Sequence, residues 1–407
     1  MVHDPGVFRM KRPTLWIALT RPDNLVNALA IATAGRERFG ACRLLHENSS
    51  WWIGLDWAEY ARRFDQVDTV EKVPECRGLR DLPRFYRALQ RRQRTFAALG
   101  IGAEDTLVTL AGVTKLSIAL ASAYPGVNKC LCVTVKKYAD ASRPWSWRQY
   151  RPTTSGFLQR WLVEPLLGLR RTVRLKPWRG GGDGVRLERP KEPLEKIFNT
   201  VLLLSNDGTE RPATAGPNVR TAPFPSLHDL GDFAPASDAD HDGPPVVVFF
   251  GTPFLLVRNL SPAVYRENLN ACLSTLRRWY GADCQLIYRP HPAETTEREH
   301  LDLSGFEIEQ DRQVAELYFL RNFHRIRAVF SVSSTVSRVA FNYGLNAYAL
   351  WRCFPFDDTA AEYFTTLMGR VPPAFEIRSL EQMPFTCRAT ANPPQSFLEI
   401  VESTLRL

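Results

Sequence analysis

Two short stretches of this sequence constrain the fold most, because in each one an apolar run breaks abruptly into polar residues. The first is Cys284–Pro292 (CQLIYRPHP), and the second, about forty residues further on, is Val329–Thr335 (VFSVSST). Both runs have the length of a buried strand, and the second continues into helical spacing of apolar residues from Val336. In an open α/β sheet, ligands bind beyond the carboxyl ends of the strands. Both stretches are therefore predicted to border one site.

Apolar runs and helical patterns alternate along the rest of the chain. In the first half, strands are expected at Leu15–Leu19, Arg43–Leu45, Trp51–Leu55, Val67–Val73, Thr106–Leu110, Lys129–Val135 and Ile197–Leu204, and helices at Leu25–Ala34, Leu82–Leu99 and Val113–Ala121. Further along, strands are expected at Val246–Phe250, Gln285–Tyr288, Phe306–Ile308, Ala328–Phe330 and Ala347–Leu350, and helices at Pro262–Tyr280, Gln313–Asn322 and Val336–Tyr343. This alternation predicts an α/β fold with parallel, doubly wound sheets.

With 407 residues, the chain is too long for one ordinary core, so two domains are expected. Between about 211 and 245, apolar periodicity is lost and Pro, Gly, Asp and Ala dominate, which is typical of a linker. We predict one Rossmann-like domain at 1–230, a linker at 231–245 and a second Rossmann-like domain at 246–407. A last helix is expected within Pro394–Leu407, and it could cross back to the first domain.

Charge and cysteine content narrow the classes of partner. The net charge of +9 favours an anionic partner, such as a nucleotide, an acidic polysaccharide, a phospholipid surface or a nucleic acid. No apolar run is long enough to span a membrane, and Met1–Arg12 is charged, so a cytoplasmic protein is expected. The cysteines form no Cys-x-x-Cys unit, so neither a disulfide framework nor a structural metal is predicted.

The segment 143–184 differs from its surroundings. Between Arg143 and Arg179, tryptophans and other aromatic residues interleave with arginines, and Glu164 is the single acid. Such a stretch can lie peripherally on an anionic membrane, at its inner face. Equally, it can pack on the sheet while its arginines bind an acidic acceptor or face water. Nucleic-acid binding is not expected, because no recognised motif accompanies the basic run. Gly180–Gly184 lacks the residues of a phosphate loop and is predicted to be flexible.

His291 is the strongest candidate for acid–base chemistry. It lies between Pro290 and Pro292, directly after a predicted strand, and Arg289 stands two residues before it. The two prolines restrict the backbone, so the imidazole is held at the strand end. An imidazole with a pKa of about 6.5 can donate a proton or a hydrogen bond to a leaving phosphate at neutral pH. A single histidine after a strand can also be structural, but the flanking prolines and the matching Ser-Ser-Thr segment favour the functional interpretation.

Ser333, Ser334 and Thr335 stand at the amino end of a predicted helix. Free backbone amides and the helix dipole favour a phosphate at that point, and the hydroxyls add hydrogen-bond donors. The same residues are also good helix caps, which is the plainer interpretation of the triplet on its own.

Asp207 is the carboxylate of the first domain best placed to act as a base. It follows a predicted strand and precedes Gly208, which lets a substrate approach the backbone. An Asp-Gly turn is an equally good interpretation.

Two doubly wound domains facing each other across a cleft suit a nucleotide-sugar transferase, in which the second domain holds the donor and the first holds the acceptor.

Together, these motifs resemble those of bacterial sialyltransferases and polysialyltransferases of the GT-B fold, which use a CMP-activated sugar. The shared elements are the His-Pro motif (His291-Pro292), the Ser-Ser/Thr motif (Ser333–Thr335) and an acidic-acidic-Gly motif in the first domain, whose first place is Asn206 here. The opening strand, turn and Asn-Ala helix of that family are similar to Thr20–Pro22 and Asn27–Ala28.

The resemblance implies roles for individual residues. His291 would contact and protonate the CMP phosphate, Ser333–Thr335 would bind it, and Asp207, or Asp242 as a fallback, would be the general base. Donor-binding residues would further include Gly251, Thr252, Arg289 and Pro292. The implied function is inverting transfer of a sialic acid or related 2-keto sugar from a CMP donor to a surface glycan or glycolipid, in capsule or lipopolysaccharide biosynthesis. Such a donor needs no cofactor and no metal.

Two alternatives stay open at this point. CDP-glycerol or other polyol-phosphate transferases of wall polymers carry a similar Arg-x-His-Pro and Ser-Ser pattern. Those enzymes usually place acids around the Ser-Ser segment, whereas the neighbours here are Val332, Val336, Ser337 and Arg338, which counts against that class. From a different class, the chain could be a non-catalytic relative that binds a glycan or a membrane.

Overall fold

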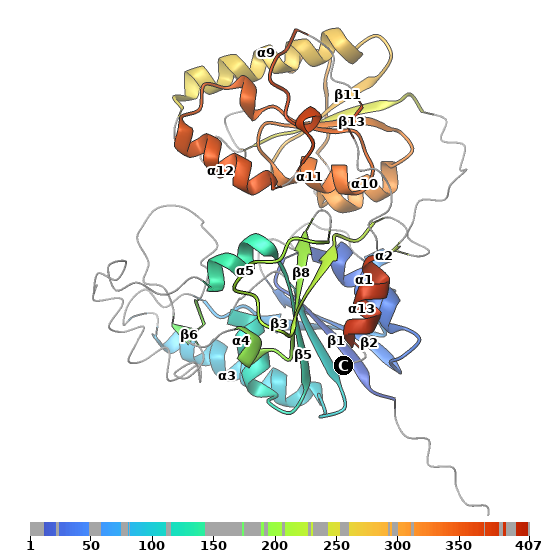
Figure 1. Ribbon diagram of the computed structural model, residues 1–407, viewed down its shortest axis with the longest axis vertical. Coiled ribbons are helices and arrows are strands. Elements are labelled where there is room, and N and C mark those ends of the chain that lie inside the picture. The colour runs from blue at the N-terminus through green and yellow to red at the C-terminus, as the bar shows by residue number, and fades with distance from the viewer. Residues whose placement is uncertain are drawn as a thin grey trace, which may run out of the picture. The chain divides into compact units, whose positions relative to one another are not determined.

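The computed structural model describes most of the chain, including two parallel sheets. The described residues are 12–21, 24–48, 58–74, 80, 82–110, 115–142, 173–174, 189–190, 194–205, 208–226, 229–230, 243–252, 260–291, 294, 300–310, 313–369, 371–381, 386–387 and 396–405. Two compact units share the chain, one formed by Met1–Pro223 with Gln395–Leu407 and the other by Phe224–Pro394 (Figure 1).

The first unit is built on a parallel sheet. Within the described part of the chain this sheet has seven strands, in the order β3-β2-β1-β4-β5-β8-β9. The strands are β1 (Thr14–Leu19), β2 (Ala41–Asn48), β3 (Gln66–Glu71), β4 (Thr106–Leu110), β5 (Asn128–Thr134), β8 (Thr200–Ser205) and β9 (Val219–Pro223). The helices are α1 (Leu25–Gly35), α2 (Ala58–Ala61), α3 (Leu82–Leu99), α4 (Lys115–Ala123), α5 (Val135–Ser142), α8 (Leu194–Ile197) and α13 (Phe397–Leu405). Two further short strands, β6 (Val173–Arg174) and β7 (Arg189–Pro190), pair antiparallel.

Helices cover both faces of this sheet. All six residues of β1 are buried, and their side chains alternate between the faces, as a strand covered on both sides requires. On one face, Trp16 packs in a cluster with Phe96 of α3 and Leu116 of α4. On the other face, α1 lies so close to the sheet that a Cβ on Gly35 would stand 2.4 Å from the side chain of Leu15. Helix α13, from the end of the chain, packs beside α1 (Figure 1).

The second unit is built on a smaller parallel sheet. Its five strands, counted over the described residues, have the order β12-β11-β10-β13-β14. They are β10 (Val246–Phe250), β11 (Gln285–Arg289), β12 (Glu307–Ile308), β13 (Ile326–Ser331) and β14 (Ala347–Ala349). The helices are α9 (Pro262–Tyr280), α10 (Ala315–Asn322), α11 (Thr335–Asn342) and α12 (Asp358–Met368), with 3-10 turns η9 (Trp351–Cys353) and η10 (Pro373–Phe375). The strand order reverses between β10 and β13, which makes this point a topological switch.

These two sheets confirm the predicted fold class, α/β with two doubly wound, Rossmann-like domains, which are the components of a GT-B-like fold. One part of the sequence interpretation is wrong: the segment between about 211 and 245 is not all linker, because β9 lies within it and forms the edge of the first sheet. Val219 and Ala222 of this strand are buried while Arg220 and Thr221 are partly exposed. A five-residue edge strand with so few apolar side chains leaves little periodicity to detect.

Several other predictions fall outside the described residues. The strand predicted at Trp51–Leu55 and the glycine-rich run Gly180–Gly184 are among them, as is the basic segment 143–179 apart from Val173–Arg174. Over the residues that are described, no helix is both long enough and apolar enough to cross a membrane.

Arg92 of α3 is buried in the first unit, where it pairs with the carboxylate of Glu47. Its side chain is 2% exposed and forms an ion pair with Glu47 of β2. Its Nε and Nη2 also donate to the carbonyl oxygen of Glu71, at 3.1 and 2.8 Å. The ion pair joins α3 to β2, the second strand of the sheet, through two largely buried side chains.

Replacing Glu47 with alanine is expected to lower the free energy of unfolding by about 3–5 kcal/mol, because the buried guanidinium would lose the counter-charge that Glu47 supplies. The Arg91–Glu71 pair is the matched control, since its side chains are 58% and 40% exposed. Glu71→Ala is expected to cost roughly 1 kcal/mol or less. Urea denaturation followed by circular dichroism compares the two variants, and equal losses would contradict the role given to Glu47.

Candidate functional site

The carboxyl edge of the second sheet collects most of the predicted donor-site residues. Phe250, the last residue of β10, pairs in register with Arg289 of β11 and Ser331 of β13. The residues that follow these three strands therefore leave the sheet at one level, and they include Gly251, His291 and Ser333. The backbone N–H of Gly251 also donates to the carbonyl oxygen of Arg289, at 2.8 Å. This edge lies at the topological switch point, where open α/β sheets bind their ligands.

Helix α11 begins at this edge with an ordered cap. Ser334 is the N-cap residue, in extended conformation, and its hydroxyl oxygen accepts from the backbone N–H of Val336 at 3.2 Å. Behind it, the hydroxyls of Ser331 and Ser337 lie 2.7 Å apart and are buried. The backbone N–H of Ser334 donates to the Ser331 hydroxyl at 3.3 Å. The structural role of Ser334 as a cap is thus observed, and it fixes the helix end whose dipole faces the edge.

The loop after β11 is held by a residue that the sequence interpretation missed, Glu294. Its carboxylate Oε2 accepts from the backbone N–H of His291 at 2.9 Å, while its own backbone N–H donates to the carbonyl oxygen of His291 at 2.8 Å. The side chain of Glu294 thus reaches back three residues to a backbone amide, as the glutamate of a capping box does, while its backbone N–H closes a turn on the His291 carbonyl. A glutamate three places after His291 was the available signal in the sequence.

The carboxylate of Glu294 is buried within the second unit. Its residue is 7% exposed, and Oε1 accepts from the hydroxyl of Tyr288 at 2.6 Å. Gly251 lies against the same group: a Cβ at that position would stand 2.2 Å from Oε2 and 2.8 Å from the Tyr288 hydroxyl. Glycine is therefore required here for space, and the carboxylate connects the ends of β10 and β11.

His291 is partly buried at the start of this loop. Burial lowers the pKa of its imidazole below the ordinary value of 6.5. The lowered pKa makes the neutral form dominant at pH 7, so the ring enters the site as a neutral hydrogen-bond donor. An anion bound beside the ring would favour the charged form and raise the pKa again.

Thr252 and Arg289 differ in the hydrogen-bonding groups that they present at the carboxyl edge of the second sheet. Thr252 is 7% exposed, and its hydroxyl oxygen is buried without a hydrogen-bond partner among the described residues. Leaving a hydroxyl unpaired in this way costs roughly 1–3 kcal/mol, which a ligand oxygen could recover. Arg289 instead turns inward. Its Nη2 donates to the carbonyl oxygen of Gln313 at 3.0 Å and its guanidinium lies 4.0 Å from the ring centre of Tyr318, so its observed contacts are internal.

The remaining predicted site residues lie outside the described residues. These are Asp207, Asn206, Pro292 and the fallback Asp242. Strand β8 ends at Ser205, so Asp207 follows a carboxyl strand end in the chain, as predicted. Among the described residues, no group of three His, Cys, Asp or Glu side chains could hold a metal ion.

Comparison with known proteins shows similarity of fold at low identity. No protein-family model matches the sequence, and no curated protein matches it either. Among solved structures, the UDP-N-acetylglucosamine 2-epimerase from Rickettsia bellii is 13% identical, with a TM-score of 0.42, over 84% of this chain and 79% of that one.

Two other solved structures cover more of the chain. The ADP-heptose LPS heptosyltransferase II of E. coli is 10% identical, with a TM-score of 0.39, over 97% of this chain and 98% of that one. TcCGT1 in complex with UDP is also 10% identical, with a TM-score of 0.47, over 97% and 90%. Resemblances this distant assign no substrate or reaction, so a function has to follow from the residues of the chain itself.

Proposed function

We propose that this protein is an inverting, metal-independent glycosyltransferase that moves a sialic acid or related 2-keto sugar from a CMP donor to a hydroxyl of a surface glycan. The observation that carries the proposal is the edge of the second sheet, where His291 and the amino end of α11 follow strands that end in register. A helix amino terminus stabilises a departing phosphate, and so does an imidazole, whose protonated form an adjacent anion favours.

In this reaction, an acceptor oxygen attacks the anomeric carbon of the sugar as the bond from that carbon to the CMP phosphate breaks. Asp207 would take the proton from the acceptor hydroxyl. The negative charge that develops on the phosphate would be met by the amino end of α11, at Ser333–Thr335, and by the imidazole of His291. Donation of a proton from His291 to the phosphate would complete the departure of CMP.

The buried carboxylate of Glu294 has a positioning role in this mechanism. It binds the backbone N–H of His291 and the Tyr288 hydroxyl, so it fixes the backbone that carries the imidazole. Thr252 would supply its unpaired hydroxyl to the nucleotide.

Nucleotide release from different donors tests the proposal. The purified protein is incubated with a glycan acceptor and with CMP-sialic acid, CDP-glycerol or UDP-N-acetylglucosamine, each with and without EDTA. CMP release that depends on the acceptor and is insensitive to EDTA is expected. Release from CDP-glycerol alone would replace the proposal with a polyol-phosphate transferase, and release from the UDP sugar alone would exclude a CMP donor. No release from any donor would favour a non-catalytic glycan-binding protein.

A further inference from the structure

Helix α3 of the first unit carries a straight row of arginines on its outer face. Arg84, Arg87, Arg91 and Arg94 follow each other at intervals of three, four and three residues, which places them along one side of a helix. All four are exposed, and the helix contains no aspartate or glutamate. At 1.5 Å per residue the row is about 15 Å long. We call these four residues the α3 arginine row.

The opposite face of α3 is fully used by the fold. Phe85, Leu89, Phe96 and Leu99 are buried in the core of the first unit. The helix therefore has no apolar side free to insert into a lipid layer or a hydrophobic groove. Whatever the α3 arginine row binds must be held by charge and hydrogen bonds, with Tyr86, which is 41% exposed, as the aromatic neighbour.

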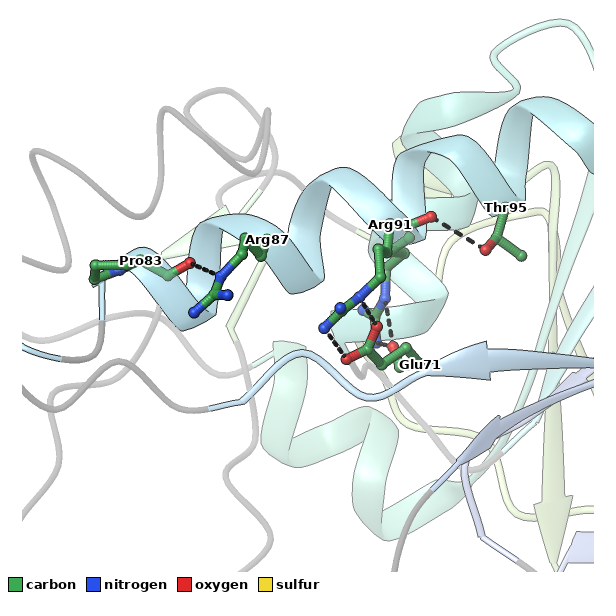
Figure 2. A network of polar contacts seen from close by, with 6 residues as sticks. Glu71, Pro83, Arg87, Arg91 and Thr95 are labelled. Atoms are coloured by element: carbon green, nitrogen blue, oxygen red, sulfur yellow. Dashed lines mark hydrogen bonds and ion pairs between the residues drawn. The ribbon is translucent and has the colours of Figure 1, made fainter.

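Most of the charge in the row is uncompensated. Arg91 is bound through Nε and Nη2 to both carboxylate oxygens of Glu71, at 2.6 and 2.7 Å (Figure 2). Arg87 donates only to the backbone carbonyl of Pro83, at 3.3 Å, and keeps its charge (Figure 2). Arg84 and Arg94 form no ion pair with any described residue. Three guanidinium groups thus face outward without a counter-ion from the described protein.

We propose that the α3 arginine row docks the first unit onto a membrane surface that contains anionic phospholipids. Guanidinium groups bind phosphates in pairs of hydrogen bonds and are weakly hydrated, so they suit lipid headgroups. A straight row along the exposed face of a helix can touch a planar surface over its whole length, whereas a single-stranded polymer is usually gripped in a basic groove with several stacking aromatics. This inference concerns a different segment from 143–179 and does not depend on the proposed reaction.

Vesicle flotation tests the proposal on the full chain. We expect wild-type protein to float with phosphatidylcholine vesicles that contain phosphatidylglycerol, to stay unbound with phosphatidylcholine alone, and to be released by added salt. The triple variant Arg84→Gln, Arg87→Gln and Arg94→Gln is expected to partition roughly 100-fold more weakly, because each arginine near an anionic surface contributes on the order of 1 kcal/mol. Exposed glutamines are compatible with the helix, and circular dichroism verifies the fold.

A control variant separates the effect of the α3 arginine row on vesicle binding from the effect of net charge alone. Arg36, Arg38 and Arg62 are exposed arginines of the same unit outside α3, and changing all three to glutamine removes the same charge. This control is expected to float like the wild type. The proposal is overturned if wild type does not bind anionic vesicles, if both triple variants lose binding equally, or if the α3 variant loses binding to heparin or RNA while its vesicle binding is unchanged.

Discussion

In the His291→Ala variant, kcat/KM for the sugar donor is expected to fall by about 10²- to 10⁴-fold, the range typical for loss of a positioned general acid. The structure gives the reason. His291 follows β11 at the same edge of the sheet where β13 leads into α11, with β10 between the two strands, and Glu294 fixes its backbone. Without the imidazole, the departing phosphate would keep the helix amino end but lose its proton donor. Coupled assays of CMP release measure the change in kcat/KM.

The pH dependence of the same reaction provides a second readout. Burial puts the pKa of His291 below 6.5 in the free protein, so the protonated form becomes populated only as the pH falls below that value. If the imidazolium is the acid, kcat/KM of the wild type is expected to rise toward acid pH, and His291→Gln should lose this rise. A His291→Ala protein with wild-type kcat/KM, or a variant with the same pH profile, would contradict the role.

Stability has to be followed in those acid assays. Because the folded pKa of His291 lies below its unfolded value, the unfolded chain binds more protons as the pH falls through about 6.5. Stability contributed by the neutral ring is therefore present above that pH and lost below it. Burial also lowers the pKa of His46 in the first unit, and it adds to the same acid destabilisation. A loss of activity at low pH counts against the mechanism only where the protein remains folded.

Much of the fold could be predicted because long elements carry a strong hydrophobic periodicity within their own residues. The helix predicted at Leu82–Leu99 and the one at Pro262–Tyr280 have the observed bounds. Ser261 caps the second of them through a hydrogen bond to the N–H of Val264, and Pro262 opens it, which is a strong start signal. By contrast, β9 was not predicted, because it has only five residues at a sheet edge and its neighbours in the sequence are turn-forming residues.

Helix α12 shows a signal that was present but not used. Asp357 caps it by accepting from the backbone N–H of Ala360 at 2.8 Å, and Gly369 ends it with a φ of 67°. An aspartate before an apolar pattern and a glycine after it are ordinary start and stop signals. For the candidate site, the pattern predicted that β11 and β13 end at the same edge of one sheet, as the register shows. It could not show that the Arg289 guanidinium packs against Tyr318, because that contact joins distant parts of the chain.

The contact between Gly251 and Glu294 could not be predicted from sequence either. It leads to a second prediction of a large effect, on the free energy of unfolding. Each residue is expected to be costly to change alone. Glu294→Ala removes an acceptor of the Tyr288 hydroxyl and of the His291 N–H, at roughly 1–3 kcal/mol for each hydrogen bond lost. Gly251→Ala puts a Cβ 2.2 Å from Oε2. Moving that carboxylate breaks its hydrogen bonds, so a loss of about 1–3 kcal/mol is expected.

Combining the two changes is expected to cost less than their sum. In the double variant Gly251→Ala with Glu294→Ala, the new Cβ occupies space that the carboxylate has left, so the steric part of the cost disappears. We expect an interaction free energy of about 0.5–3 kcal/mol, measured by urea denaturation of all four proteins. Gly126→Ala is the control, since a Cβ there meets nothing within 4 Å, and it should be nearly neutral. Strictly additive losses would mean that the carboxylate does not fill the space beside Gly251.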